Sequence, residues 1–240
     1  MSIRRVEKID DIVQVRHVFM SVADKTNLET LVPSLIDNCP EVVIYSTGGT
    51  YKKIAGILDD MVEDENTNHN PNLKNHVLEV SEYTGLPETE GGLVKSLHHK
   101  LFLGYLTEAY SEAHQRDLER EDAVPIDLTI QNMYPFEDVV AKEGIDIEEA
   151  RGNIDVGGPS ALRAASKNWH RVAVVTDPND YKRLIEELET NNGCTTLRTR
   201  FELHKKAFRF LANYNKAIAD FVEEVPFKEA IKTYEIVRGN

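Results

Sequence analysis

The segment Glu41-Val-Val-Ile-Tyr-Ser-Thr-Gly-Gly-Thr-Tyr-Lys-Lys-Ile-Ala-Gly-Ile-Leu58 decides the fold class of this chain. It opens with a compact apolar run of strand length, and residues 51–58 follow with apolar side chains at helical spacing. Between the two lies a glycine turn, residues 47–50. A strand that leads through a glycine-rich turn into a helix is typical of parallel α/β sheets. The segment therefore predicts an α/β protein.

The alternation of strand and helix continues on both sides of this segment. Further strands are predicted at residues 13–22, 76–80, 126–131 and 171–175, and further helices from Asp24, which can cap the first one, to Leu35, at 181–188 and at 197–222. Residues 59–73 are acidic and then rich in Asn, which predicts a surface loop. We interpret residues 1–240 as one αβα domain, with a core at about 13–190 and a helical C-terminal extension at about 195–225.

The net charge of the chain limits the classes of partner that it is expected to bind. It carries 28 Lys and Arg against 41 Asp and Glu, a net charge of −13. A negative surface repels phosphate backbones and anionic lipids, so neither nucleic acid nor a membrane surface is expected as the main partner. A small phosphorylated ligand remains compatible, because charges are screened beyond about 8 Å at physiological salt.

Cysteine usage and the N-terminus indicate the compartment. Cys39 and Cys194 are too few and too far apart in sequence for a disulfide framework or a structural zinc site, so no metal is expected. The first basic residues are not followed by an apolar stretch, and no run approaches the ~18 apolar residues that cross a bilayer. These features predict a soluble cytoplasmic protein.

The glycine turn has the chemistry of a phosphate site. Gly48 and Gly49 let the backbone approach a ligand closely, and the helix behind them offers unpaired N–H groups. Thr47 and Thr50 can add hydroxyl donors, and Lys25 follows the neighbouring strand at the same edge of the sheet. The same residues also fit an ordinary strand-to-helix turn, so both interpretations stay open at this point.

A series of short segments, together with residues 203–208 and 214–219 at the end, resembles one known family. In chain order they are Ser21-Val-Ala-Asp-Lys-Thr, Ser46-Thr-Gly-Gly-Thr, Ser81-Glu-Tyr-Thr-Gly-Leu-Pro-Glu, Gly91-Gly-Leu-Val-Lys-Ser-Leu-His, Asn132-Met-Tyr-Pro-Phe, Asn153-Ile-Asp-Val-Gly-Gly-Pro-Ser and Leu162-Arg-Ala-Ala-Ser-Lys-Asn. Together they are similar to the IMP cyclohydrolase domain of the bifunctional AICAR transformylase/IMP cyclohydrolase family.

The resemblance implies a fold and an activity. The implied fold is methylglyoxal-synthase-like, with three αβα layers and a mainly parallel sheet. The implied activity is the closure of FAICAR to IMP with loss of water, without metal or organic cofactor, in a homodimer. The transformylase half of the family is absent from this sequence, which implies either a separate AICAR transformylase as a partner or an excised domain.

The resemblance also assigns roles to individual residues. Lys95 would act on the formyl oxygen as a cation or proton donor, with Tyr134 as its proton-transfer partner. Asp155 and Lys167 would serve as acid and base at the carboxamide, and Asn132 would hold the base by its amide. Ring closure between two tethered groups needs mainly positioning and proton transfer, which such polar side chains supply.

The same segments imply further substrate contacts, and some of their residues also have a structural interpretation. Additional substrate contacts are implied at Ser21, Ser96, Gly157 and Gly158. Asp155 could instead cap the helix that begins near Pro159, and Lys167 could be a helix-end cation that complements the helix dipole. His98 also matches the family and is interpreted either as a structural group or as a group that supports residues in contact with the substrate.

The chain departs from the family at two positions near the ligand. Leu93 stands where the family usually has an arginine, and Ala23 where it often has a serine. The loss of two polar groups keeps open a second hypothesis, a non-catalytic purine-nucleotide sensor or assembly subunit. Methylglyoxal synthase itself ranks last, because the segments around Asp155 and Lys167 are not expected in that enzyme.

Overall fold

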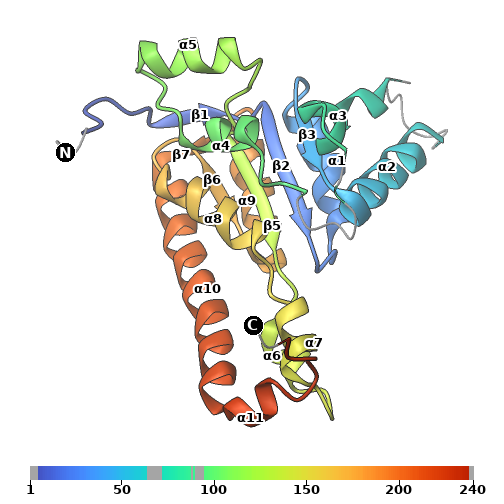
Figure 1. Cartoon of the computed structure of the whole chain (residues 1–240). Helices are drawn as coiled ribbons and strands as arrows, with labels where there is room; N and C mark the ends of the chain where they lie inside the picture. The colour runs from blue at the N-terminus through green and yellow to red at the C-terminus, as the bar shows by residue number, and fades with distance from the viewer. Residues whose placement is uncertain (1–4, 64–71, 88, 90–94, 238–240) are drawn as a thin grey trace.

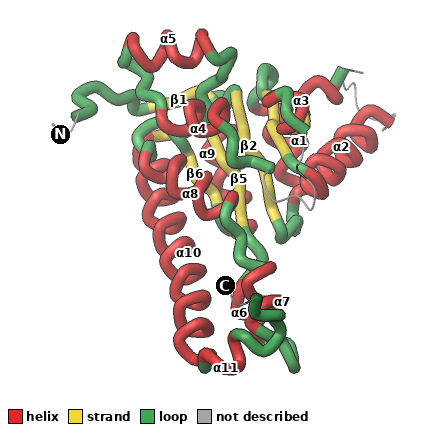
Figure 2. Tube along the Cα trace, in the orientation of Figure 1, coloured by secondary structure: helices red, strands yellow, loops and turns green. Residues whose placement is uncertain are grey.

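A five-stranded parallel sheet forms the centre of the computed structural model, which describes residues 5–63, 72–87, 89 and 95–237 (Figures 1 and 2). The strand order is β4-β3-β2-β5-β6, and every neighbouring pair is parallel. The strands are β2 (His17–Val22), β3 (Val43–Ser46), β4 (Val77–Glu79), β5 (Leu128–Asn132) and β6 (Ala173–Val175). The predicted α/β class is confirmed.

Helices cover both faces of this sheet. One apolar core joins it to α1 (Leu28–Asn38), α2 (Gly48–Glu63) and α9 (Tyr181–Thr190). A second core on the opposite face joins it to α4 (His99–Leu106), α8 (Gly157–Lys167) and α10 (Leu197–Glu224). Alternate side chains of a strand point to opposite faces, so β2 gives Phe19 to one core and Met20 to the other. The three αβα layers are confirmed.

The C-terminal helix has two parts. Buried side chains of its first half, from Leu203 to Tyr214, pack on the sheet and on α8. Its second half runs beyond the carboxyl ends of the strands, where it forms a small lobe with α6 (Phe136–Val140), α7 (Ile147–Gly152) and α11 (Phe227–Ala230) (Figure 1). Phe136 links α6 to α10 through edge-on contacts with Tyr214 and Phe221. The predicted C-terminal helix is thus present, but only its end is an extension.

The remaining elements are short. They are β1 (Ile12–Gln14), β7 (Cys194–Thr196), α3 (Val80–Thr84), α5 (Glu112–Arg120) and two 3₁₀ turns, Leu73–His76 and Pro178–Asp180. The two 3-residue strands β1 and β7 pair antiparallel as a separate ribbon.

Two local predictions at the N-terminal end are wrong. The strand predicted at 13–22 is divided into β1 and β2, because Oδ2 of Asp127 accepts hydrogen bonds from the backbone N–H groups of Arg16 and His17 (both 3.0 Å) and turns the chain there. Asp24 does not cap α1. Its carboxylate accepts from Thr26 N (2.9 Å), and the helix begins after Asn27, whose φ is 63°.

The predicted surface loop at 59–73 also differs in part. Helix α2 continues to Glu63, and Leu73 is buried in a 3₁₀ turn. Residues 64–71 lie outside the described residues. Cys39 and Cys194 are free and buried, and burial raises the pKa of the Cys39 thiol to about 12.

The described residues contain neither a candidate membrane-spanning helix nor a candidate metal-ligand cluster. None of the helices in this part of the chain has the length and apolar character needed to cross a membrane. Across the same ranges, no group of 3 or more His, Cys, Asp and Glu side chains lies close enough to hold a metal ion.

Candidate active site

The glycine turn lies at the carboxyl end of β3 and forms the start of α2. Gly48 has a φ of +45°, a conformation that side chains other than glycine adopt reluctantly. A methyl group placed on Gly48 would lie 3.7 Å from Nζ of Lys95, and one placed on Gly49 would lie 4.0 Å from Nζ of Lys25. Two ammonium groups thus meet a helix N-terminus, and all three features attract an anion.

A cavity of about 620 Å³ opens beside this turn. The predicted site residues that line it are Ser21, Thr47, Lys95, Ser96, Asn132, Asp155, Gly157 and Gly158. The hydroxyl groups of Ser21 and Thr47 lie 3.1 Å apart and connect the end of β2 to the turn. Segments that are far apart in sequence therefore meet at the carboxyl edge of the sheet, where open α/β folds bind ligands.

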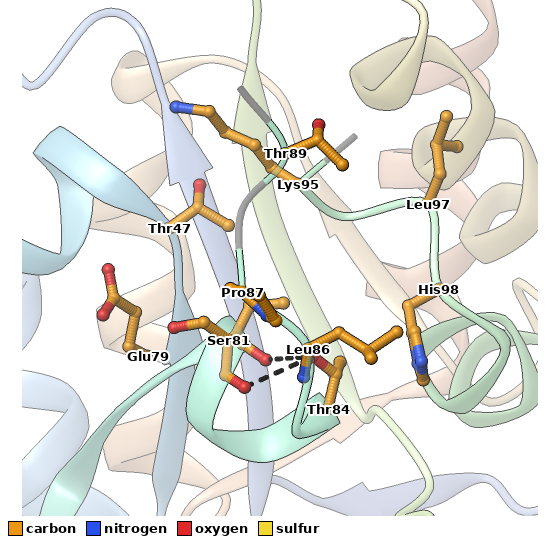
Figure 3. A pocket seen from close by; sticks show the side chains of 11 residues that line it. Thr47, Glu79, Ser81, Thr84, Leu86, Pro87, Thr89, Lys95, Leu97 and His98 are labelled. Atoms are coloured by element: carbon orange, nitrogen blue, oxygen red, sulfur yellow. Dashed lines mark hydrogen bonds between the residues drawn. The ribbon is translucent and has the colours of Figure 1, made fainter. Parts of the chain in front are cut away.

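A smaller neighbouring cavity of about 100 Å³ shares Thr47 and Lys95 with the first (Figure 3). Figure 3 shows Thr47 and Lys95 on one side of it and Leu97 and His98 on the other. Nδ1 of His98 accepts a hydrogen bond from Lys100 N (3.2 Å) and caps α4. This bond agrees with the structural alternative for His98, and Leu93 lies outside the described residues.

The carboxylate of Asp155 is held by two elements. Its Oδ1 accepts from Gly158 N (2.9 Å) in the first turn of α8, and its backbone N–H donates to the hydroxyl of Tyr214 on α10 (2.8 Å). A methyl group on Gly158 would come within 2.6 Å of Asp155 Oδ2, so only glycine fits there. The helix-cap interpretation of Asp155 thus holds, and the same bonds fix the carboxylate at the wall of the cavity.

The structure gives Thr50 a different role from the predicted one. Its Oγ1 accepts from Val22 N (3.0 Å) and donates to Val22 O (3.1 Å), and the residue is buried. The hydroxyl group therefore joins α2 to the end of β2 and has no hydrogen left for a phosphate.

Replacing Thr50 by Val should reduce stability rather than substrate binding. The N–H group of Val22 would lose the bond to Thr50, and its carbonyl oxygen would keep only the bond from Lys25 Nζ (3.2 Å), which together costs about 1–3 kcal/mol in the free energy of unfolding. Urea titration followed by circular dichroism measures this loss. Thr47→Val is the matched control, because Thr47 faces the cavity and its replacement removes only the bond to the Ser21 hydroxyl (3.1 Å), so it should cost less stability than Thr50→Val. Equal stability of Thr50→Val and the wild type would contradict the assignment.

Asn132 also differs from the prediction. Its Oδ1 accepts from Asp24 N (2.9 Å) and its Nδ2 donates to Asp24 O (3.2 Å). Both ends of the amide hold the loop after β2, so the side chain does not hold a catalytic base as predicted. It forms part of the wall and supports the loop that carries Lys25.

Tyr134 and Lys167 do not join the other predicted catalytic residues. Tyr134 is 58% exposed and lines a second cavity of about 670 Å³, which shares Asn132 with the first. Lys167 is the last residue of α8, so ~15 Å of helix separates it from Gly157. Within one chain, α8 therefore keeps Lys167 away from Asp155, and the predicted acid–base pair is not formed.

Two polar residues that the sequence did not single out also line the 620 Å³ cavity beside the glycine turn. Gln131 lies on β5 and is 4% exposed, and Arg151 on α7 forms an ion pair with Glu148 (2.5 Å). The one sequence feature that could have indicated a role for Gln131 is its polar side chain within a strand that is otherwise buried. Nothing in the sequence pattern distinguishes Arg151 from other helix-surface arginines.

Fold and site together define a class of protein. It is an αβα protein with a polar cavity at the carboxyl edge of a parallel sheet, flanked by a glycine turn, two lysines and a fixed carboxylate. The family model described as AICARFT/IMPCHase bienzyme matches residues 165–238. The chain belongs to the AICAR transformylase/IMP cyclohydrolase family, as its motifs predicted.

Individual relatives agree with this assignment. The bifunctional purine biosynthesis protein PurH of Acetivibrio thermocellus is 37% identical over 212 residues, which are 88% of this chain and 37% of that protein. PurH of Bacillus subtilis is 37% identical over 211 residues, which are 88% of this chain and 38% of that protein. The chain thus spans little more than a third of the length of these relatives. The crystal structure of ForH superposes with a TM-score of 0.69 and 26% identity, covering 87% of this chain and 99% of ForH.

Proposed function

We propose that the chain is an IMP cyclohydrolase that closes FAICAR to IMP with loss of water, in purine biosynthesis. One observation carries the proposal: Thr47 of the glycine turn, Lys95 and Asp155 line a single cavity. An anion site, a cation and a carboxylate are the groups that this ring closure needs. The names of the PurH relatives point to the same pathway.

The phosphate of the substrate would bind at the glycine turn. The N–H groups of Gly48 and Gly49 lie in the first turn of α2, and Lys25 approaches the turn on the Gly49 side. The phosphate lies away from the reacting atoms, so its contacts stabilise the ground state and the transition state equally. They therefore increase affinity without increasing the rate. It also fixes one end of the substrate and thereby limits where the imidazole ring can lie.

The reaction joins the carboxamide nitrogen to the formyl carbon. The carboxamide nitrogen loses one proton and the formamide nitrogen loses another, and the formyl oxygen gains both and leaves as water, so no oxidation or reduction takes place and no cofactor is expected. Lys95 would stabilise the developing charge on the formyl oxygen and supply a proton to it. Asp155 would accept a proton from the nitrogen, and its bonds to Gly158 and Tyr214 keep it in place.

A direct assay tests the proposal. Purified chain is mixed with FAICAR, and IMP formation is followed by absorbance and chromatography. Formation of IMP far above the uncatalysed rate is the expected result. Folded protein that gives no turnover above the uncatalysed rate would reject the activity.

One observation favours a second candidate function. Tyr134 and Lys167 lie outside the cavity that Lys95 and Asp155 line, which suits a subunit that binds a purine nucleotide without converting it. Calorimetry that finds IMP binding in a protein without turnover would select this candidate. The homodimer, cytoplasmic location and separate AICAR transformylase implied by the resemblance remain proposals, and sedimentation analysis tests the dimer.

A further inference from the structure

Gln131 is a buried polar residue that the catalytic proposal does not use. It lies on β5, an interior strand of the sheet, and is 4% exposed. Its Oε1 has no hydrogen-bond partner among the described residues, and the side chain lines the same cavity as Lys95 and Asp155. An unpaired buried carbonyl oxygen is unfavourable, and such groups are rare in folded proteins. A partner that enters the cavity would remove this penalty.

The position of Gln131 indicates which part of a ligand it would meet. Gln131 pairs in register with Ser21 on β2, and the Ser21 hydroxyl lies 3.1 Å from that of Thr47 at the glycine turn. Neighbouring strands lie about 4.8 Å apart, so β5 is about 10 Å from β3, which carries the turn. A nucleotide with its phosphate at the turn would therefore place its ribose near Ser21 and its ring near Gln131.

We propose that the amide of Gln131 binds the heterocyclic ring of the nucleotide. The side chain offers one acceptor and two donor hydrogens in one plane. It can accept from a ring N–H and donate to the adjacent carbonyl oxygen, the pair of groups that a lactam such as hypoxanthine presents. The carboxamide of an open-ring precursor presents the same pair. Gln131 would thus orient the carboxamide nitrogen toward the formyl carbon. This role rests on the proposed function and specifies which residue contacts the ring.

Calorimetry with two probes tests this role. IMP carries both phosphate and ring, whereas ribose 5-phosphate carries the phosphate alone. Gln131→Met keeps the length of the side chain and removes its amide, so we expect the Kd of IMP to rise about tenfold to hundredfold. The Kd of ribose 5-phosphate should stay unchanged, because the glycine turn is untouched. An unchanged Kd of IMP in Gln131→Met would overturn the proposal, and so would an equal rise for both probes.

A matched control separates ring binding from a general effect of altering β5. Thr129 is fully buried on the same face of the strand, two positions before Gln131, and is not one of the described residues that line the cavity. Thr129→Val should leave the Kd of IMP unchanged, and an equal loss in both variants would overturn the proposal. Thermal unfolding of Gln131→Met should match or exceed that of the wild type, since an unpaired polar group is removed. A clear loss of stability would assign Gln131 to the fold instead.

The same measurements distinguish this inference from the proposed function. Wild-type turnover of FAICAR together with an unchanged Kd in Gln131→Met would leave the function standing and remove only the role of Gln131. A wild type that binds ribose 5-phosphate no more weakly than IMP would overturn the ring contact. A wild type that binds IMP through Gln131 but gives no turnover would support the ring contact and reject the catalysis.

Discussion

Replacing Lys95 by Ala should lower kcat by about 10²–10³-fold, which is the usual loss when one charge-stabilising donor is removed. Nζ of Lys95 approaches the glycine turn, and the side chain lines the cavity that also contains Asp155. Two other described cations lie nearby, but Lys25 is on the Gly49 side of the turn and Arg151 is paired with Glu148 (2.5 Å), so we expect neither to take its place at the formyl oxygen. Steady-state kinetics of IMP formation measures the effect.

A second lysine provides the control for this experiment. Lys52 is exposed on α2, a few residues beyond the turn, and does not belong to the described lining of the cavity. Lys52→Ala changes the net charge by the same amount and should alter kcat less than twofold. If Lys95→Ala retains the wild-type kcat, the proposed mechanism is wrong even if the chain closes FAICAR.

Arg171→Met should lower the free energy of unfolding by about 3–5 kcal/mol, the usual cost of breaking a buried ion pair. Arg171 is 6% exposed, and its guanidinium donates to the carbonyl oxygens of Gly104, Thr107 (3.2 Å) and Ile126 (2.9 Å). It also lies 3.6 Å from Oδ1 of Asp127. Burial lowers the pKa of Arg171 to about 10, so the group still carries its charge at neutral pH.

Urea titration at pH 7 measures this loss of stability. In the variant, the three backbone oxygens would each lose a charged donor and Asp127 would lose its ion-pair partner, whereas Gly104 O and Thr107 O would keep their bonds from Ile126 N (3.0 Å) and Asn168 Nδ2 (2.9 Å). Arg116→Met on the exposed face of α5 is the control, since its ion pair with Glu112 is solvent-exposed and should contribute less than about 1 kcal/mol. A loss below about 1 kcal/mol for Arg171→Met would show that the buried pair is not important for the fold.

Local sequence was sufficient for the parts of the site that neighbouring residues build. The glycine turn follows from a strand, two glycines and a helix within one short segment, and Asp155 caps α8 from a few residues away. Lys95 was carried over from a matched motif, and its side chain indeed approaches the turn. The three αβα layers could be predicted because apolar runs of strand length alternate along the chain with amphipathic segments of helix length.

Roles that depend on distant partners could not be predicted from the sequence. The hydroxyl of Thr50 pairs with Val22, 28 positions away, and the amide of Asn132 pairs with Asp24, 108 positions away. No local pattern distinguishes these bonds from contacts with a ligand. The separation of Lys167 from Asp155 follows from the length of α8, which the motif match did not take into account.

A crystal structure of the chain with IMP tests the central claim most directly. The account predicts the phosphate within hydrogen-bonding distance of the N–H groups of Gly48 and Gly49, with the ring between Lys95 and Gln131. A nucleotide bound in the cavity that Tyr134 lines, or a phosphate held away from the glycine turn, would contradict it.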